Sequence, residues 1–244
     1  MPEKRTRSRR SSSDNGMKFK YVFFDRDGVL IYADREKTAQ RDAMIAGWGG
    51  TPFPIDYDTM MALFAVAAEG AEPWYRDVEE EKAFFRRYYR AMLEKAGARE
   101  RQEERAGILF DTFWLKSGRV YPEVEGVLRR FAAAGCRMGV ISDTSPSLEL
   151  SLRMLGLADW FESFTCSALA GCGKPDPRIY RAAMNSLGAA PEECLYIDDY
   201  RPEADGARDV GMTAFHLDRA GIEPAGTPWT VRSLEEFLLR AEAL

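Results

Sequence analysis

The pattern of apolar and polar residues changes character twice along the chain. An apolar run at Tyr21–Phe24, followed by two acids and Gly28, is typical of a buried strand that ends in a tight turn. Between about residues 33 and 119 the pattern is helical, and Glu79–Leu93 repeats aromatic side chains at i, i+4 and i+8. From Tyr121 onward, helical and strand patterns alternate.

The alternating part predicts a sequence of helices and strands. We expect helices at Glu123–Ala134, Pro146–Leu155, Pro177–Leu187, from the acids after Ile197 to about Val210, and at Leu234–Ala243, with strands at Arg137–Ile141, Cys194–Ile197 and Met212–Leu217. Such alternation implies an α/β fold, a doubly wound, Rossmann-like parallel sheet covered on both faces. Ligands of these sheets bind beyond the carboxyl ends of the strands.

Composition narrows the function classes. The chain has 244 residues, of which 45% are apolar and 30% charged, and its formal net charge is −5. This charge argues against nucleic acid or an acidic membrane surface as partner. No apolar run approaches the ~18–20 residues of a transmembrane helix. Residues 1–16 are basic and Ser-rich without an apolar stretch, so we expect a disordered tail and no secretory signal.

Cysteine and histidine usage excludes several chemistries. The four cysteines form no C-x-x-C pair and are expected as free thiols in a reducing cytoplasm. His216 is the only histidine and lies in a predicted strand, which favours a structural role. Zinc binding and Ser-His or Cys-His catalysis are therefore poorly supported.

Two carboxylates follow the first strand. Asp25 and Asp27 are two residues apart, so in extended chain both side chains point the same way. Two carboxylates held together repel each other and raise one pKa unless a cation lies between them. The pair indicates either a shared proton or a bound cation, although a strand end can also be acidic by chance.

Other polar residues fall at the ends of other predicted strands. Ser142 and Asp143 follow Val140 and Ile141, and Asp198 and Asp199 follow Ile197; Lys174 lies in a loop rich in Gly and Pro. Each has an ordinary explanation alone, such as capping the next helix. Together they place carboxylates, a hydroxyl and one lysine on the same rim of one sheet.

These motifs resemble those of the haloacid dehalogenase-like (HAD) hydrolase superfamily, of the type with an inserted helical cap (subfamily IA), broadly like phosphoglycolate phosphatases. The resemblance covers about residues 19–240 and rests on four motifs, namely Phe24-Asp25-Arg26-Asp27-Gly28, Ile141-Ser142-Asp143, Lys174-Pro175-Asp176 and Ile197-Asp198-Asp199. Asp143 stands where asparagine is common. The resemblance implies a core domain at 17–32 and 120–244, with a helical cap domain at 33–119 that closes over the site.

The resemblance also implies roles. Asp25 would be the nucleophile, forming an aspartyl-phosphate. Asp27 would protonate the leaving alcohol and then deprotonate water, and we expect the surrounding acids to raise its pKa. Dehalogenases lack this second acid, so Asp27 favours phosphate esters over organohalides. Lys174 would offset the charge of the phosphate, and Ser142, with backbone N–H groups near Asp143, would bind its oxygens.

A hard divalent ion, Mg²⁺, is the implied cofactor. Its ligands would be the Asp25 side chain, the Asp27 backbone carbonyl and Asp199. Adjacent residues of a continuing strand alternate faces, so Asp198 and Asp199 are not both expected to point inward. Asp198 is expected just outside the ligand set, with Glu203 close enough to hold a metal-bound water.

Three functions remain open at this point. The first is a Mg²⁺-dependent phosphatase acting on a small phosphorylated metabolite, as a monomer or homodimer in the cytoplasm. The second is a phosphomutase that uses the same aspartyl-phosphate, and the third is a catalytically silent binding protein on the same fold. In the cap, Arg35, Lys37, Arg41 and Trp48 could contact the leaving group, or could form a solvated helix face with one packing aromatic.

Overall fold

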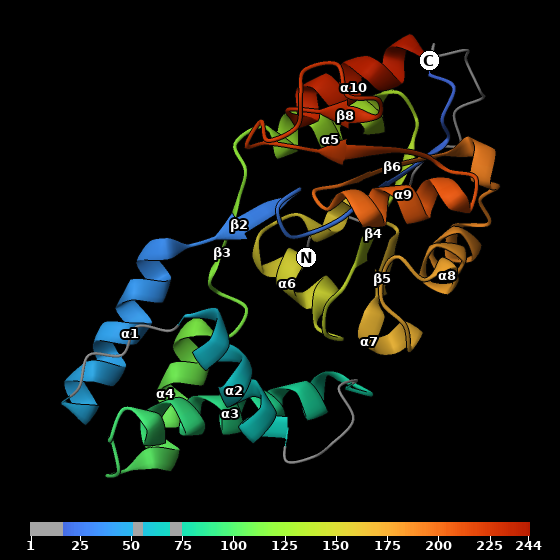
Figure 1. The fold of residues 1–244 in the computed structure, drawn as a ribbon. Helices are drawn as coiled ribbons and strands as arrows, with labels where there is room; N and C mark the ends of the chain where they lie inside the picture. Colours follow the sequence, from blue (N-terminus) through green and yellow to red (C-terminus); the bar gives the residue numbers. More distant parts are fainter. Residues whose placement is uncertain (1–16, 51–55, 69–74) are drawn as a thin grey trace, which may run out of the picture.

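A computed structural model describes residues 17–50, 56–68 and 75–244. Its centre is a six-stranded, all-parallel sheet in the order β5-β4-β1-β6-β7-β8 (Figure 1). The strands are β1 (Tyr21–Phe24), β4 (Arg137–Ser142), β5 (Ser163–Cys166), β6 (Cys194–Asp198), β7 (Thr213–Leu217) and β8 (Thr230–Val231). The predicted tail, residues 1–16, lies outside the described residues.

Helices cover both faces of this sheet, as the alternating pattern predicts. They are α5 (Val124–Ala133), α6 (Leu148–Met154), α7 (Ser167–Ala170), α8 (Pro177–Leu187), α9 (Arg201–Asp209) and α10 (Leu234–Ala243). In β1, Val22 and Phe24 pack in the cluster that includes residues of α5, α6 and α10, whereas Phe23 packs in the cluster that includes residues of α8 and α9. Successive side chains of a strand point to opposite faces, so a strand between two helix layers must be apolar throughout. The predicted doubly wound α/β fold is confirmed.

Element boundaries agree best where a cap residue marks them. The helices Pro177–Leu187 and Leu234–Ala243 have the predicted bounds, and Gly188 follows the first in the left-handed conformation. The helix expected at Pro146–Leu155 is shorter, because α6 begins only at Leu148. Strands β5 and β8 were not predicted; with four and two residues, they are too short to show a period.

Four further helices form a separate segment, here called the four-helix segment: α1 (Arg35–Gly49), α2 (Tyr57–Ala68), α3 (Val78–Lys95) and α4 (Gln102–Phe113). They pack around their own apolar cluster, which includes Ile45, Leu63, Tyr88 and Leu109. The helix expected at Glu79–Leu93 lies within α3, and Asp77 caps its first turn by accepting from the N–H of Glu80.

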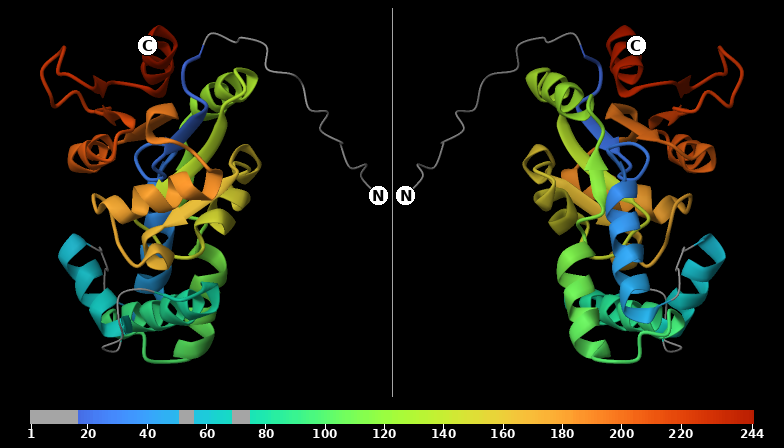
Figure 2. Two further views of the ribbon diagram at one scale, coloured as in Figure 1. Left: turned by 90° about the vertical axis from the view of Figure 1, so that its right-hand side faces the viewer. Right: turned by 90° about the vertical axis from the view of Figure 1, so that its left-hand side faces the viewer.

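A two-stranded antiparallel ribbon links this segment to the sheet. It pairs β2 (Ile31–Ala33) with β3 (Gly118–Val120), and neither strand was predicted. The views in Figures 1 and 2 show the four helices beyond one end of the sheet, connected to it through this ribbon. The expected limits of the cap, residues 33 and 119, fall in the two ribbon strands; the division into core and cap domains stays a prediction.

One buried polar contact joins the four-helix segment to the sheet layer. Glu81 of α3 is 1% exposed, and its carboxylate accepts hydrogen bonds from the backbone N–H (2.9 Å) and hydroxyl (2.6 Å) of Ser147. Ser147 directly precedes α6, where a helix leaves N–H groups unpaired. The Glu81 carboxylate of the four-helix segment thus caps α6 of the sheet layer. This contact ties α3 to the start of α6.

Candidate active site

The site lies at the carboxyl ends of three neighbouring strands, β4, β1 and β6. Asp25 directly follows β1, Ser142 ends β4 and Asp198 ends β6, so the sheet order brings them together. Asp25 is fixed by its own backbone, whose N–H donates to the carbonyl of Ile197 (3.0 Å). The side chains at this edge are strongly buried: Asp25 is 5%, Ser142 1% and Asp198 1% exposed.

Lys174 lies at the centre of this group. Its Nζ is 2.8 Å from Asp25 Oδ1, 2.7 Å from Asp198 Oδ2 and 2.6 Å from Glu203 Oε2. Burial by itself would lower the pKa of Lys174, but its three carboxylate partners raise that pKa well above the usual range. The lysine is therefore a permanent ammonium that orients the nucleophile predicted from the sequence.

The carboxylates at the site outnumber the positive charge. Asp25, Asp198 and Asp199, here called the acidic cluster, each offer one oxygen, and these atoms all lie within 4.8 Å of one another. Burial raises the pKa of Asp25 to about 8, with Asp198 adding to the rise and Lys174 opposing it. Burial likewise raises the pKa of Glu203 to about 7. A further cation at this site would stabilise the ionised form of these acids.

Asp198 and Asp199 lie at the end of β6, where the alternation of side chains between the two faces of the sheet was expected to separate them. Strand β6 ends at Asp198, so the alternation of a continuing strand does not reach Asp199, and both carboxylates belong to the acidic cluster. The expectation that only one of them points inward assumed a strand that continues through both residues, and β6 does not meet that condition. Asp198 is bound by the protein, with Oδ2 held by Lys174 and Tyr196 and Oδ1 accepting from the N–H of Tyr200. Asp199 is exposed.

The turn after β1 is fitted closely to Asp199. Gly28 has φ +74°, and a Cβ at this position would lie 1.9 Å from Asp199 Oδ2. Only glycine meets both conditions, because it tolerates positive φ and has no side chain. The turn and the acid after β6 are therefore in direct contact, which the sequence pattern alone did not reveal.

Arg219 holds the same turn from the other side. Its guanidinium donates to the carbonyls of Gly28 and Val29 (both 2.9 Å), forms an ion pair with Glu123 (2.6 Å) and lies 3.7 Å from the centre of the Tyr121 ring. Sequence reasoning missed this residue. Its position shortly after β7, at the same edge of the sheet, is the signal that could have suggested it.

Asp27 differs from its expected surroundings. Its side chain is 61% exposed, and its carboxylate forms an ion pair with the Arg26 guanidinium at 2.7 Å. Asp27 is nevertheless near enough to contribute to the raised pKa of Asp25 and of Asp199. The acids near Asp27 are therefore only part of its surroundings, because the adjacent Arg26 pairs with its carboxylate.

Two further predicted residues support Lys174. The carboxylate of Asp143 accepts from the backbone N–H of Lys174 (2.9 and 3.1 Å), so it holds the lysine loop with its side chain. Glu203 pairs with the ammonium of Lys174, and its expected place near a metal-bound water stays a prediction. His216 lies in β7 as predicted, with Nε2 3.2 Å from the carbonyl oxygen of Asp199.

The candidate residues of α1 are placed differently from one another. Arg41 lines a cavity between the four-helix segment and the sheet, while Trp48 packs against the buried cluster of the segment and lies under the Arg105 guanidinium (5.5 Å). Arg35 is exposed and Lys37 is half-buried. Of the four, Arg41 alone lines this cavity among the described residues.

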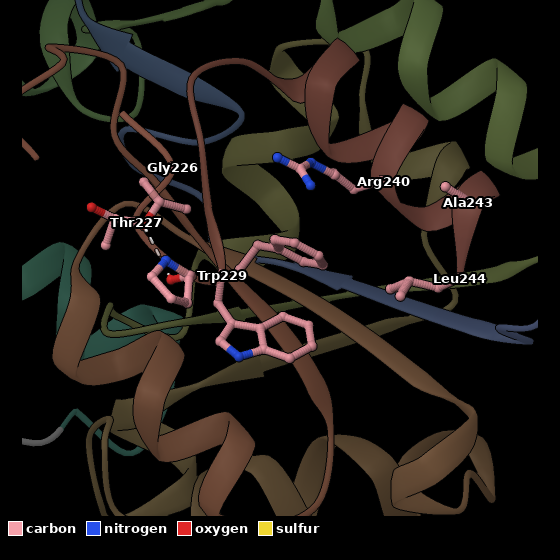
Figure 3. Close-up of a pocket in the computed structure, with 9 residues that line it drawn as sticks. Gly226, Thr227, Trp229, Arg240, Ala243 and Leu244 are labelled. Atoms are coloured by element: carbon pink, nitrogen blue, oxygen red, sulfur yellow. Dashed lines mark hydrogen bonds between the residues drawn. The ribbon is translucent and has the colours of Figure 1, made fainter. Parts of the chain in front are cut away.

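A separate cavity of about 400 Å³ lies near the C-terminus (Figure 3). Trp229, Arg240 and Leu244 border it, and no acidic side chain is among its described lining residues. It shares no residue with the acidic cluster. The carboxyl edge of the sheet is thus the place where chemically reactive groups converge.

The four cysteines are buried and free, in agreement with the expectation of no disulfides. Within the described ranges, none of the helices combines the length and apolar character that crossing a bilayer requires.

Comparison with known proteins relates this chain to hydrolases. A protein similar over most of the chain is a phosphatase of Mycobacterium tuberculosis (strain CDC 1551 / Oshkosh), 28% identical over 235 residues, which cover 91% of this chain and 98% of that protein. A phosphoserine phosphatase of Thermus thermophilus is 36% identical over 170 residues, 66% of each protein. The crystal structure of a 2-haloacid dehalogenase from Pseudomonas syringae has a TM-score of 0.65 at 22% identity, covers 91% of this chain and 98% of its own, and shows the shared fold alone.

A family model described as haloacid dehalogenase-like hydrolase matches residues 19–211. The match contains all four motifs that suggested the resemblance and extends over well more than half of the chain. The chain therefore belongs to the haloacid dehalogenase-like hydrolase family.

Proposed function

We propose that this protein is a Mg²⁺-dependent phosphatase that hydrolyses a small-molecule phosphomonoester through an aspartyl-phosphate on Asp25. The observation that carries the proposal is a buried carboxylate at the end of β1, held by the Lys174 ammonium at 2.8 Å within a group of further acids. The phosphatase names of two relatives agree with it.

Asp25 is suited to nucleophilic attack on phosphorus. Lys174 binds its Oδ1 and so fixes the plane of the carboxylate. A carboxylate is a weak base, but phosphoryl transfer has a loose transition state that depends more on positioning and charge than on nucleophile strength. The bond from the Asp25 oxygen to phosphorus forms as the phosphorus–oxygen bond to the leaving alcohol breaks.

Asp27 handles the protons in this mechanism. Protonated, it gives its proton to the leaving oxygen; as a carboxylate, it then removes a proton from the water that hydrolyses the aspartyl-phosphate. Its carboxylate forms an ion pair with Arg26 and is near enough to Asp25 to contribute to the raised pKa of that residue. The overall reaction consumes the phosphomonoester and one water molecule and yields the alcohol and inorganic phosphate, so no other reactant is needed.

Two groups of donors bind the phosphate oxygens. One is at the carboxyl end of β4, and the other is Lys174 in its loop. Lys174 supplies positive charge, and Ser142 supplies a hydroxyl beside backbone N–H groups of the residues that follow. Asp143 positions Lys174 by accepting from its backbone N–H. Two unit charges 4 Å apart interact by about 4 kcal/mol at an effective dielectric of 20, so one lysine offsets a substantial part of the repulsion between phosphate and Asp25.

The acidic cluster fits Mg²⁺ by its donor chemistry. Mg²⁺ prefers oxygen ligands, and within the cluster Asp25 and Asp199 offer carboxylate oxygens within 4.8 Å of each other. Asp25, Asp199 and the Asp27 backbone carbonyl would hold the ion. Asp198, whose oxygens are already bonded within the protein, would stay outside the ligand set, with Glu203 on Lys174. When bound, the ion supplies charge that neutralises the phosphate and the acids.

The proposal is tested by release of inorganic phosphate from p-nitrophenyl phosphate. We expect turnover with Mg²⁺, loss with EDTA, and a decrease of at least about 1,000-fold in kcat for Asp25→Asn. Asp159→Asn is the matched control, since the Asp159 side chain is 97% exposed and outside the site. Near-normal turnover by Asp25→Asn would overturn the proposed mechanism. With a sugar phosphate as substrate, an isomeric sugar phosphate in place of inorganic phosphate would indicate a mutase.

A further inference from the structure

A cavity of about 320 Å³ lies between the four-helix segment and the sheet layer, and the proposed proton donor Asp27 is among its lining residues. Asp27 and Arg26 line it from the turn after β1, and residues of α1, α2, α3 and α4 line it from the other side. If the proposed function is right, the leaving alcohol occupies the space next to Asp27. The lining of this cavity therefore indicates which alcohol fits, an inference that rests on the proposed function.

Aromatic rings form a large part of the walls of this cavity, beside hydroxyl groups such as those of Ser117 and Ser151. Six rings contribute to the lining, namely Phe64, Phe85, Tyr88, Tyr89, Phe113 and Trp114. Several of them contact one another, with ring centres of Phe64 and Tyr88 4.6 Å apart and those of Phe85 and Tyr88 6.2 Å apart. Apolar surface that enters such a pocket gains about 25 cal/mol per Å². A sugar hydroxyl that loses water there without a partner costs roughly 1–3 kcal/mol.

The charges of the lining are already paired. Arg26 and Arg41 are the only cationic side chains among the described residues that line the cavity. Arg26 forms an ion pair with Asp27 at 2.7 Å, and Arg41 forms one with Asp42 at 2.8 Å. A second anionic group on the substrate would therefore lose its hydration without gaining an unpaired cation. The lining disfavours leaving groups that carry a carboxylate or another phosphate.

We infer that the cavity selects phosphomonoesters of uncharged, apolar or aromatic alcohols. The phosphate would remain at Asp25 and Lys174, and the apolar body of the alcohol would lie among the rings of the four-helix segment. This class differs from both sugar phosphates and phosphorylated amino acids or hydroxy acids. A preference for esters of apolar or aromatic alcohols would come from the cavity lining, because the catalytic residues contact only the phosphate and the leaving oxygen.

Three primary-alcohol phosphates of comparable leaving-group basicity test the inference. We would measure kcat/KM with Mg²⁺ for 2-phenylethyl phosphate, ribose 5-phosphate and O-phosphoserine by release of inorganic phosphate. We expect 2-phenylethyl phosphate to be hydrolysed at least tenfold more efficiently than either of the others. Equal or faster hydrolysis of ribose 5-phosphate or phosphoserine overturns the inference but supports the proposed function, whereas no hydrolysis of any ester overturns both.

Leu115 offers a substitution that changes polarity without disturbing the backbone. It lines the cavity and has φ +58°, a conformation that asparagine tolerates better than leucine. Leu115→Asn should keep the melting temperature and lower the preference for 2-phenylethyl phosphate over ribose 5-phosphate about tenfold. Leu239→Asn is the matched control, since Leu239 lies on α10 and is 62% exposed. A preference unchanged in Leu115→Asn contradicts the inference.

Discussion

Replacing Gly28 by alanine tests whether the turn after β1 and the acid after β6 act as one site. The added Cβ would lie 1.9 Å from Asp199 Oδ2, whereas real Cβ contacts are essentially never shorter than 3.0 Å. Asp199 is exposed, so its carboxylate can move away by roughly 1 Å at little cost to the fold. The substitution is therefore expected to displace one member of the acidic cluster while leaving the chain folded.

The backbone cost of this substitution can be separated from the displacement. Alanine in the left-handed conformation costs about 1–2 kcal/mol. Gly188 has φ +67°, follows α8 at the opposite edge of the sheet, and has no atom within 4 Å of the Cβ position. Gly188→Ala thus pays the same backbone cost without a contact at the site. Both variants should lose similar stability, about 2–8 °C in melting temperature for a chain of this size.

Activity should distinguish the two variants. A misplacement of about 1 Å in a catalytic group can cost about 100-fold in rate. We expect Gly28→Ala to lose about 100-fold in kcat/KM for p-nitrophenyl phosphate and to need more Mg²⁺ for half-maximal activity. Gly188→Ala should stay within about threefold of the wild type. If Gly28→Ala keeps the activity and the Mg²⁺ requirement of Gly188→Ala, Asp199 does not take part in the site as argued.

Three further predictions concern residues around the site. Arg219→Ala should lower kcat about 10- to 100-fold in steady-state assays and should also lower the free energy of unfolding, because each charge-assisted hydrogen bond to the turn after β1 is worth about 1.5–3 kcal/mol. Glu81→Ala should lower the free energy of unfolding in urea by about 1–3 kcal/mol, since the buried N–H of Ser147 loses its acceptor. Burial opposes ionisation of Asp218, but two backbone N–H groups and Arg232 lower its pKa to about 2. Because this pKa is below the usual value of 3.8, Asp218 stabilises the fold above about pH 4, and the melting-temperature difference between wild type and Asp218→Asn should disappear as pH falls toward 2.

The candidate site residues are predictable from the sequence because strand ends carry their own signal. A short apolar run followed by Asp25 and Gly28 marks the end of a buried strand whatever surrounds it. The same holds for Ser142 at the end of β4 and Asp198 at the end of β6. In a parallel sheet these ends share one edge, so the sequence pattern predicted a common site without any contact being known.

The contacts that shape the site depend on residues far apart in the chain. Arg219 reaches the turn at Gly28 across 191 positions, and Glu81 caps Ser147 across 66. The ion pair of Arg26 with Asp27 is different, because it joins neighbours in the turn that follows β1. No local pattern encodes the two long-range pairs, since exposed and buried arginines or glutamates look alike in a sequence.

The sequence by itself determined the α/β class, the ends of β1, β4 and β6 to within one residue, and which polar residues stand at those ends. These follow from local rules: the period of apolar residues, glycine after a helix, and acids after a strand. The tertiary structure alone decided that Asp198 and Asp199 both enter the acidic cluster, that Lys174 pairs with three acids, and that an aromatic cavity adjoins Asp27. Those features depend on where strands end and how two packed units meet, which are properties of the whole chain in space.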